Sequence, residues 1–178
     1  MQRILLAITC LLVPGRFFAG QNPPQIVEVR TLLATDAAHP GSAVKAAVVA
    51  QIAPGYHINS HQPSLDYLIP TDLKLNGNGR VNLEELSFPK GSLKKLAFSD
   101  APLSVYEGQL VVGALLKVAK GVPPGAYKLE GKFSFQACND HACLPPASVP
   151  VTLTVRVVSP TVPLKRQNVD VFAQLKFE

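Results

Sequence analysis

The sequence predicts an all-β protein, an immunoglobulin-like β-sandwich, on three observations. Apolar residues recur with the two-residue period of half-buried strands. Gly, Pro and Asn clusters interrupt these segments at short intervals, as turns do. No segment of the body shows the period of an amphipathic helix, and the 16 prolines suit short edge strands and long loops better than a helical bundle.

The segment 43–52 shows the strand pattern most clearly. Its residues Val44, Ala46, Val48 and Ala50 have the same parity, so they share one face of a strand. The full set of predicted strands is 26–33, 43–52, 72–75, 81–88, 105–118, 126–136 and 149–157, with turn sequences such as NGNG (76–79), PKG (89–91) and VPPG (122–125) between them. About seven strands is typical of an immunoglobulin-like sandwich.

The first 20 residues have the pattern of a signal peptide. Arg3 precedes an apolar run, 4–13, broken only by Thr9, and small residues follow at Ala19 and Gly20. The run is much shorter than the roughly 20 apolar residues of a spanning helix, so an uncleaved anchor is the weaker alternative. We expect cleavage near Gly20, loss of Cys10 with the leader, export and no membrane span in the mature chain.

The mature chain is predicted to form one domain, 21–160, followed by a tail, 161–178. In the tail, we expect a short helix capped by Asn168, with Val169, Phe172 and Leu175 on one face, and we expect the tail to pack on the sandwich. Loss of two basic residues with the leader reduces the formal charge from +5 to +3. The remaining Lys and Arg residues are scattered, which excludes a nucleic-acid-binding surface.

The mature chain keeps two cysteines, Cys138 and Cys143, separated by four residues that include the turn formers Asn139 and Asp140. A β-hairpin there would bring the sulfurs together, and a disulfide closing so small a loop would add only ~2 kcal/mol of stability. This small gain in stability favours a chemical role for the pair over a stabilising one. Spacing alone leaves two interpretations open, a redox pair and a structural clip.

The histidines offer an alternative, a copper or zinc site. His57 and His61 lie four residues apart, and His141 lies between the cysteines, where its positive form would favour a thiolate. Prolines bracket the segment around 57–61, however, so we expect surface histidines in a loop, as for His39. We therefore assign no metal ligands.

Several segments together carry a family pattern. They are GYHINS (55–60), LIPT (68–71), FP (88–89), VYEG (105–108), QAC (136–138) and CLPP (143–146). In order and spacing, over about 25–157, they resemble the N-terminal periplasmic domain of the thiol:disulfide interchange protein DsbD. The cysteine segment is the most specific part of the resemblance.

The resemblance implies an immunoglobulin-like domain that passes electrons, without a small cofactor, between a membrane-embedded reductase and periplasmic thioredoxin-fold proteins. Cys143 would form the mixed disulfide with the partner, and Cys138 would resolve it. A cap loop with an aromatic residue would cover the cysteines. Phe98 is the candidate, with core anchoring as its alternative, and Tyr56 and His141 are candidates to line the site.

The family's full-length protein continues into a membrane domain and a thioredoxin-like domain. This chain holds neither apolar spans nor a Cys-x-x-Cys motif. We therefore expect a separate membrane reductase to exchange electrons with it. Three hypotheses follow: a redox carrier, a protein-binding module whose disulfide is structural, and a copper or zinc module.

Overall fold

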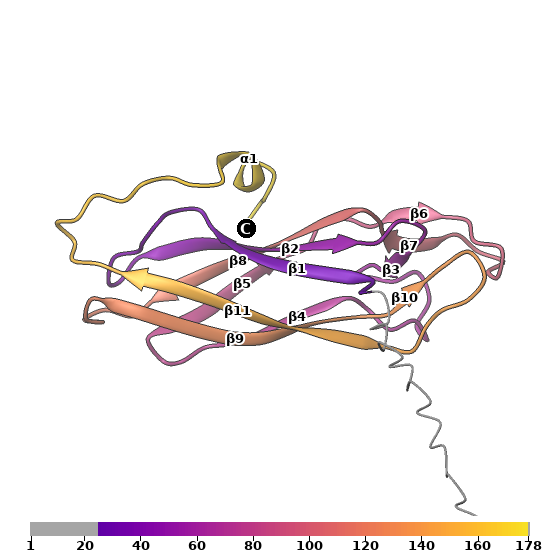
Figure 1. Ribbon diagram of the computed structural model, residues 1–178, viewed down its shortest axis with the longest axis horizontal. Helices are drawn as coiled ribbons and strands as arrows, with labels where there is room; N and C mark the ends of the chain where they lie inside the picture. Colours follow the sequence, from indigo (N-terminus) through magenta and orange to yellow (C-terminus); the bar gives the residue numbers. More distant parts are fainter. Residues whose placement is uncertain (1–24, 178) are drawn as a thin grey trace, which may run out of the picture.

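The computed structural model describes residues 25–177, in which eleven strands form a β-sandwich (Figure 1). One layer is the sheet β1-β2-β8-β5 and the other is β11-β9-β4, while a small sheet, β10-β3-β7-β6, lies at one end. The strands are β1 (Val27–Leu33), β2 (Ala43–Ile52), β3 (His57–Asn59), β4 (Asp72–Asn76), β5 (Val81–Ser87), β6 (Ser92–Lys94), β7 (Leu103–Tyr106), β8 (Gln109–Val118), β9 (Gly125–Phe135), β10 (Ala137–Cys138) and β11 (Ala147–Val157). The predicted all-β sandwich is confirmed, whereas the predicted signal peptide lies outside the described residues.

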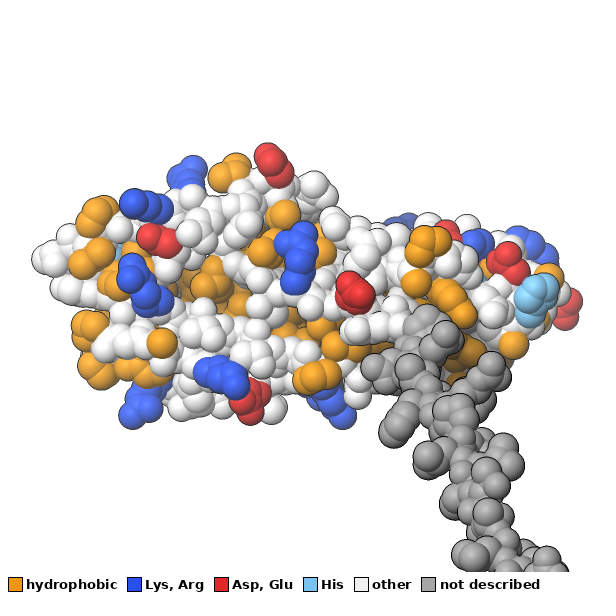
Figure 2. Space-filling view, viewed as in Figure 1, with side chains coloured by type: hydrophobic (Ala, Val, Ile, Leu, Met, Phe, Trp, Pro, Cys, Tyr) orange, Lys and Arg blue, Asp and Glu red, His pale blue; other side chains and the backbone are white. Residues whose placement is uncertain are grey.

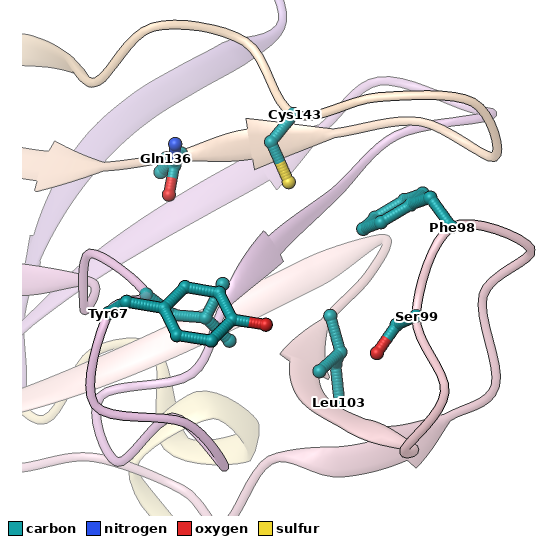
Figure 3. A pocket seen from close by; sticks show the side chains of 7 residues that line it. Tyr67, Phe98, Ser99, Leu103, Gln136 and Cys143 are labelled. Carbon is teal, nitrogen blue, oxygen red and sulfur yellow. The ribbon is translucent and has the colours of Figure 1, made fainter.

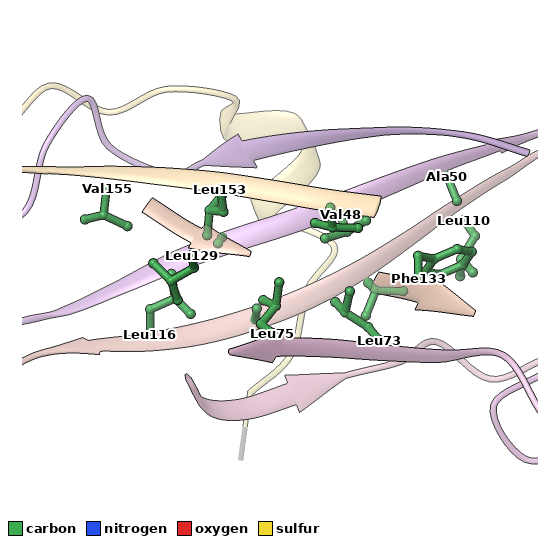
Figure 4. Close-up of a cluster of buried hydrophobic side chains, with 14 of the residues drawn as sticks. Val48, Ala50, Leu73, Leu75, Leu110, Leu116, Leu129, Phe133, Leu153 and Val155 are labelled. Atoms are coloured by element: carbon green, nitrogen blue, oxygen red, sulfur yellow. The ribbon is translucent and has the colours of Figure 1, made fainter. Parts of the chain in front are cut away.

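The core lies between the two large sheets and consists of alternate residues of their strands (Figure 4). On β2, Val44, Ala46, Val48 and Ala50 all belong to it, as their shared parity predicts. Strand β9 contributes the fully buried Phe133 from the opposite layer. Burial of each large apolar side chain contributes about 1.5–3 kcal/mol, so this interior is the main source of stability.

Two predictions about the strands are wrong. The segment 105–118 is two strands, because the chain turns at Gly108, whose φ of 63° is one that glycine adopts readily. The strands β3, β6 and β10 were missed, since two or three residues are too few to show alternation. Both errors concern the small sheet at the end of the sandwich.

The small sheet has one face on the sandwich core and one face turned away from it. Ile58 of β3, Tyr106 of β7 and Ala137 of β10 belong to the main core cluster. Side chains alternate along a strand, so the neighbouring residues His57 and Cys138 lie on the opposite face. Cross-strand pairing agrees, because His57 is directly opposite Cys138.

The C-terminal tail lies along the outside of the sheet β1-β2-β8-β5 (Figure 1). Its helix, α1, spans only Val169–Phe172, and the predicted cap is wrong: the Asn168 side chain makes no cap hydrogen bond and instead donates to the Leu33 carbonyl at 2.9 Å. Farther on, the Phe177 ring lies 5.0 Å from the ammonium of Lys45 and covers Gly113, where a Cβ atom would lie 2.9 Å from the ring. The absence of a side chain at Gly113 thus lets the tail approach the sheet.

Candidate redox site

A tight turn joins the two cysteines. The side-chain oxygen of Asn139 accepts hydrogen bonds from the backbone N–H groups of His141, at 2.9 Å, and Ala142, at 3.0 Å. Asn139 N–H donates to the Ala142 carbonyl at 3.0 Å, which closes the turn. Cys138 and Cys143 are therefore neighbours, with Cα atoms 3.9 Å apart, and they form a disulfide.

The two sulfurs differ in accessibility. Cys138 is completely buried, whereas Cys143 is half-buried and lines a cavity of about 330 Å³. Figure 3 shows the Cys143 sulfur pointing into this cavity. Of the two sulfurs, that of Cys143 is therefore the more accessible, and thiol–disulfide exchange requires a sulfur that a foreign sulfur can approach.

Two loops bring aromatic side chains to the cavity. Phe98 comes from the loop 95–102 between β6 and β7, and Tyr67 from the loop 60–71 between β3 and β4 (Figure 3). Phe98 is 40% exposed and Tyr67 is 77% exposed. The remaining lining residues are Leu68, Ser99, Leu103 and Gln136.

Phe98 is not the core anchor of its loop. That position belongs to Leu96, which is buried in a second apolar cluster with Leu68, Leu103 and Val105. Contacts within the loop fix its shape: Lys95 donates to the carbonyls of Ser99 and Asp100, and Ser99 N–H donates to the Leu96 carbonyl at 3.1 Å. Phe98 is thus held beside Cys143 on a loop that is folded largely on itself.

Sequence reasoning missed Tyr67 and the role of Gln136. A signal for Tyr67 exists, since an apolar triplet, 67–69, in a loop bracketed by prolines is unusual. The Gln136 side chain accepts from the Asn59 amide at 3.3 Å and donates to the Leu144 carbonyl at 3.2 Å. Gln136 therefore ties the cysteine hairpin to β3, and only the three-dimensional structure identifies this connection.

The other site candidates lie outside the cavity lining. Tyr56 is half-buried and packs against the main core. His141 is exposed in the turn between the cysteines. Neither residue belongs to the group that surrounds Cys143.

The prediction of surface histidines is wrong for His57, which is 1% exposed. The burial of His57 was missed because β3, the strand that contains it, is too short to recognise in the sequence. Burial, followed by the positive charge of Lys94, lowers the pKa of His57, while Glu107 and Asp140 act in the opposite direction. The imidazole is therefore neutral at physiological pH.

The remaining histidines have structural contacts. The His61 ring stacks on Phe88 with centroids 3.9 Å apart, and its Nδ1 lies 2.9 Å from the Thr71 carbonyl. His39 Nε2 lies 2.9 Å from the Val162 carbonyl. Across residues 25–177, no three His, Cys, Asp or Glu side chains are grouped so that they could hold a metal ion.

The fold and the site define a class of protein: an immunoglobulin-like domain with a hairpin disulfide at one end, one sulfur of which is accessible. Residues 25–154 match the family described as the N-terminal part of the thiol:disulfide interchange protein DsbD, and the chain belongs to this family. The family and the Cys138–Cys143 disulfide together make it a thiol:disulfide interchange domain. No curated protein matches the chain significantly in sequence.

Solved structures with similar folds come from related proteins. The N-terminal periplasmic domain of ScsB from Proteus mirabilis aligns with a TM-score of 0.50 at 14% identity, over 76% of this chain and 49% of that one. The reduced DsbD N-terminal domain of Neisseria meningitidis aligns with a TM-score of 0.43 at 22% identity, over 72% and 85% of the two chains. That domain in complex with the N-terminal domain of PilB aligns with a TM-score of 0.40 at 20% identity, over 68% and 80%. The likeness to ScsB supports the fold alone.

Within residues 25–177, no helix is long and apolar enough to cross a bilayer.

Proposed function

We propose that this domain is an exported electron carrier of the periplasm, in which Cys143 is the exchanging sulfur and Cys138 the resolving sulfur. In the reduced domain, the Cys143 thiolate attacks a partner disulfide, a mixed disulfide forms, and one partner thiolate leaves. Cys138 then attacks Cys143, which releases the second partner sulfur and forms the Cys138–Cys143 disulfide. Two electrons pass to the partner, and the reverse sequence reduces the domain.

The observation that supports these roles is the unequal exposure of the two sulfurs. Cys143 faces the cavity, while Cys138 is buried behind it. A partner sulfur therefore meets Cys143 first, and only an intramolecular attack can use Cys138. The family comparison independently supports exchange as the chemistry.

The partners we propose are thioredoxin-fold proteins, with a separate membrane-embedded reductase as the source of electrons. The surface beside the cavity suits protein docking, because Tyr67 and Phe98, which line the cavity, and Ile69, next to the lining residue Leu68, expose large apolar side chains. Figure 2 shows exposed hydrophobic side chains among charged ones at this end of the molecule. Lys94, the last residue of β6, forms an ion pair with Glu107, which follows β7. The small sheet thus also carries one positive and one negative side chain.

We further propose that the loop 95–102 is a cap, with Phe98 shielding Cys143 from small thiols and disulfides until a partner docks. The support is the position of Phe98 at the cavity and its partial exposure. Leu96 anchors one end of the loop, but the hydrogen bonds of Lys95 and Ser99 stay within it, so the tip that carries Phe98 can move without disturbing the sandwich.

Serine substitutions test the two cysteine roles. Cys138→Ser should trap covalent complexes with thioredoxin-fold proteins, visible as larger species on non-reducing gels and lost on reduction, because the resolving sulfur is missing. Cys143→Ser should abolish exchange and trap nothing. The double variant, with both serines, controls for non-covalent association.

Two results would contradict the proposal. One is the absence of trapped complexes in Cys138→Ser. The other is a reduction potential below roughly −300 mV, which is typical of structural disulfides that partner proteins do not reduce.

A further inference from the structure

The face of the small sheet that carries Cys138 also carries two buried polar atoms without partners. They are His57 Nε2 and the side-chain oxygen of Asn59, and both residues are 1% exposed or less. His57 and Asn59 are two residues apart on β3, so they share a face. Gln136, whose oxygen accepts from the Asn59 amide, extends the same polar row to the cysteine hairpin.

Unpaired polar atoms in a protein interior are uncommon, and each one calls for a physical reason. His57 is directly opposite Cys138 across the β3–β10 ladder, and Cβ atoms of such pairs lie about 4.5–5.5 Å apart. In the disulfide, the Cys138 sulfur carries no proton and has nothing to donate. In the reduced domain, it carries an S–H group, which is the donor that an unpaired imidazole nitrogen lacks.

The exchange reaction creates a need for such a group. Cys138 must lose its proton before it attacks the mixed disulfide, and burial raises the pKa of a thiol because it disfavours the thiolate. Bulk water is a poor acceptor here, since Cys138 is completely buried. A neutral imidazole on His57, the residue directly opposite Cys138, would remove this obstacle by accepting the proton.

We propose that His57 is the proton acceptor for Cys138 in the resolution step, an inference that rests on the proposed exchange function. The Cys138 thiol proton passes to His57 Nε2, and the Cys138 sulfur attacks Cys143. The Cys138–Cys143 bond forms, the bond from Cys143 to the partner breaks, and the partner leaves as a thiolate. The imidazolium then returns its proton to that thiolate or to water, so the partner is reduced and this domain is oxidised.

The surroundings of His57 keep it in the form that accepts a proton. Its pKa lies below the ordinary 6.5, mainly through burial and then through Lys94 of β6. Glu107, which follows β7, and Asp140, in the cysteine turn, oppose the shift. Their negative charges would also stabilise the imidazolium during the step.

The test uses the reduced full chain with Cys10→Ser, so that Cys138 and Cys143 are its only cysteines. The reagent is dithiobis(nitrobenzoate), a small aromatic disulfide whose thiolate product is coloured. Attack by Cys143 releases the first coloured thiolate at a rate that depends on reagent concentration. Attack by Cys138 on the resulting mixed disulfide releases the second at a rate independent of concentration. The two steps of exchange are thus measured separately, without a protein partner.

In the wild type, we expect the rate of the second phase to level off above the pKa of His57 and stay nearly flat from about pH 6.5 to about pH 8. His57→Gln should slow this phase about tenfold or more at neutral pH, leave the first phase within about twofold, and show a rate that rises about tenfold per pH unit as hydroxide takes over. The matched control, His61→Gln, changes a nearby ring that stacks on Phe88 instead, and it should keep the flat profile.

Two results would overturn the proposed role of His57, and a third would overturn the proposed exchange function. A wild-type rate that rises tenfold per pH unit throughout this range overturns the role of His57, even if His57→Gln does not fold. An equal slowing by His57→Gln at every pH shows a structural role and overturns it too. If the first phase is absent both in the wild type and in Phe98→Ala, which lacks the proposed shield, Cys143 is inaccessible, and the proposed function fails instead.

Discussion

The interior between the two large sheets and the small sheet at the cysteine end differ in what they bury. The first buries aliphatic and aromatic side chains, such as Phe133 and Leu129, from strands of five to eleven residues. The second buries His57, Asn59, Ser60 and Thr71, the four buried polar side chains of the described residues, beside a cavity lined by loops. The apolar interior therefore supplies most of the stability, whereas the polar groups beside the disulfide lie at one end of the sandwich.

The C-terminal tail and the cap loop extend this comparison. The tail is hydrogen-bonded to the body at several points: Lys165 N–H donates to Asp36 at 2.9 Å, Gln167 N–H to the Ala34 carbonyl at 2.8 Å, and Ser87 to the Lys176 carbonyl at 2.5 Å. The side-chain and backbone hydrogen bonds described for the cap loop stay within it. The tail is thus tied to the sheet by hydrogen bonds, whereas the loop 95–102 is attached to the body through the buried Leu96.

The largest effect is expected from Phe133→Ala. Phe133 is completely buried and packs near Phe135, with ring centroids 5.9 Å apart. Its removal leaves a cavity that should cost about 3–5 kcal/mol of unfolding free energy, measured by denaturant titration. The folded fraction should still release both coloured thiolates from dithiobis(nitrobenzoate) at wild-type rates. Slower release from folded protein would show that the sandwich interior affects the chemistry of the cysteines.

A smaller effect is expected from Gln136→Ala, at the junction between the regions. The substitution removes the hydrogen bonds to Asn59 and Leu144 and leaves the Asn59 amide with one fewer partner. The loss of unfolding free energy should be about 1–3 kcal/mol, and a cysteine hairpin less firmly tied to β3 should exchange its backbone amide hydrogens faster. Lys132→Ala, an exposed residue of β9, is the control. Unchanged exchange of the hairpin amides would show that Gln136 does not hold it.

The smallest effect on stability, and the most specific effect on chemistry, is expected from Phe98→Ala. Because Phe98 is 40% exposed, the unfolding free energy should change by less than about 1 kcal/mol. Loss of the shield should accelerate the reaction of Cys143 with small disulfides severalfold, measured as the first phase of thiolate release. Leu93→Ala, which removes an exposed apolar side chain that does not line the cavity, should leave this rate unchanged. Equal rates for Phe98→Ala and the wild type would exclude a cap.

The sandwich was predictable because its strands are long enough for alternation to appear. Strand β2 shows this best, since its inward residues were identified from parity alone. The cysteine site was predictable only in part. Local turn chemistry around Asn139 places the two sulfurs together, but the strand that places His57 opposite Cys138 has three residues and no recognisable pattern.

The tail shows the same limit. A helix beginning after Asn168 was predicted, but its extent and cap were not, because a four-residue helix gains its stability from contacts that are distant in sequence. Its neighbour Phe177 packs on Gly113, more than sixty residues away.

The sequence alone determined the strand periods, the turn between Cys138 and Cys143 and the family pattern, since each depends on residues that are close in the chain or in a fixed order. The tertiary structure decided which sulfur faces the cavity, which aromatic side chains flank it and which histidine is buried beside Cys138. These features arise where loops from separate parts of the chain meet. Packing between distant segments, and not local preference, sets exposure and therefore reactivity.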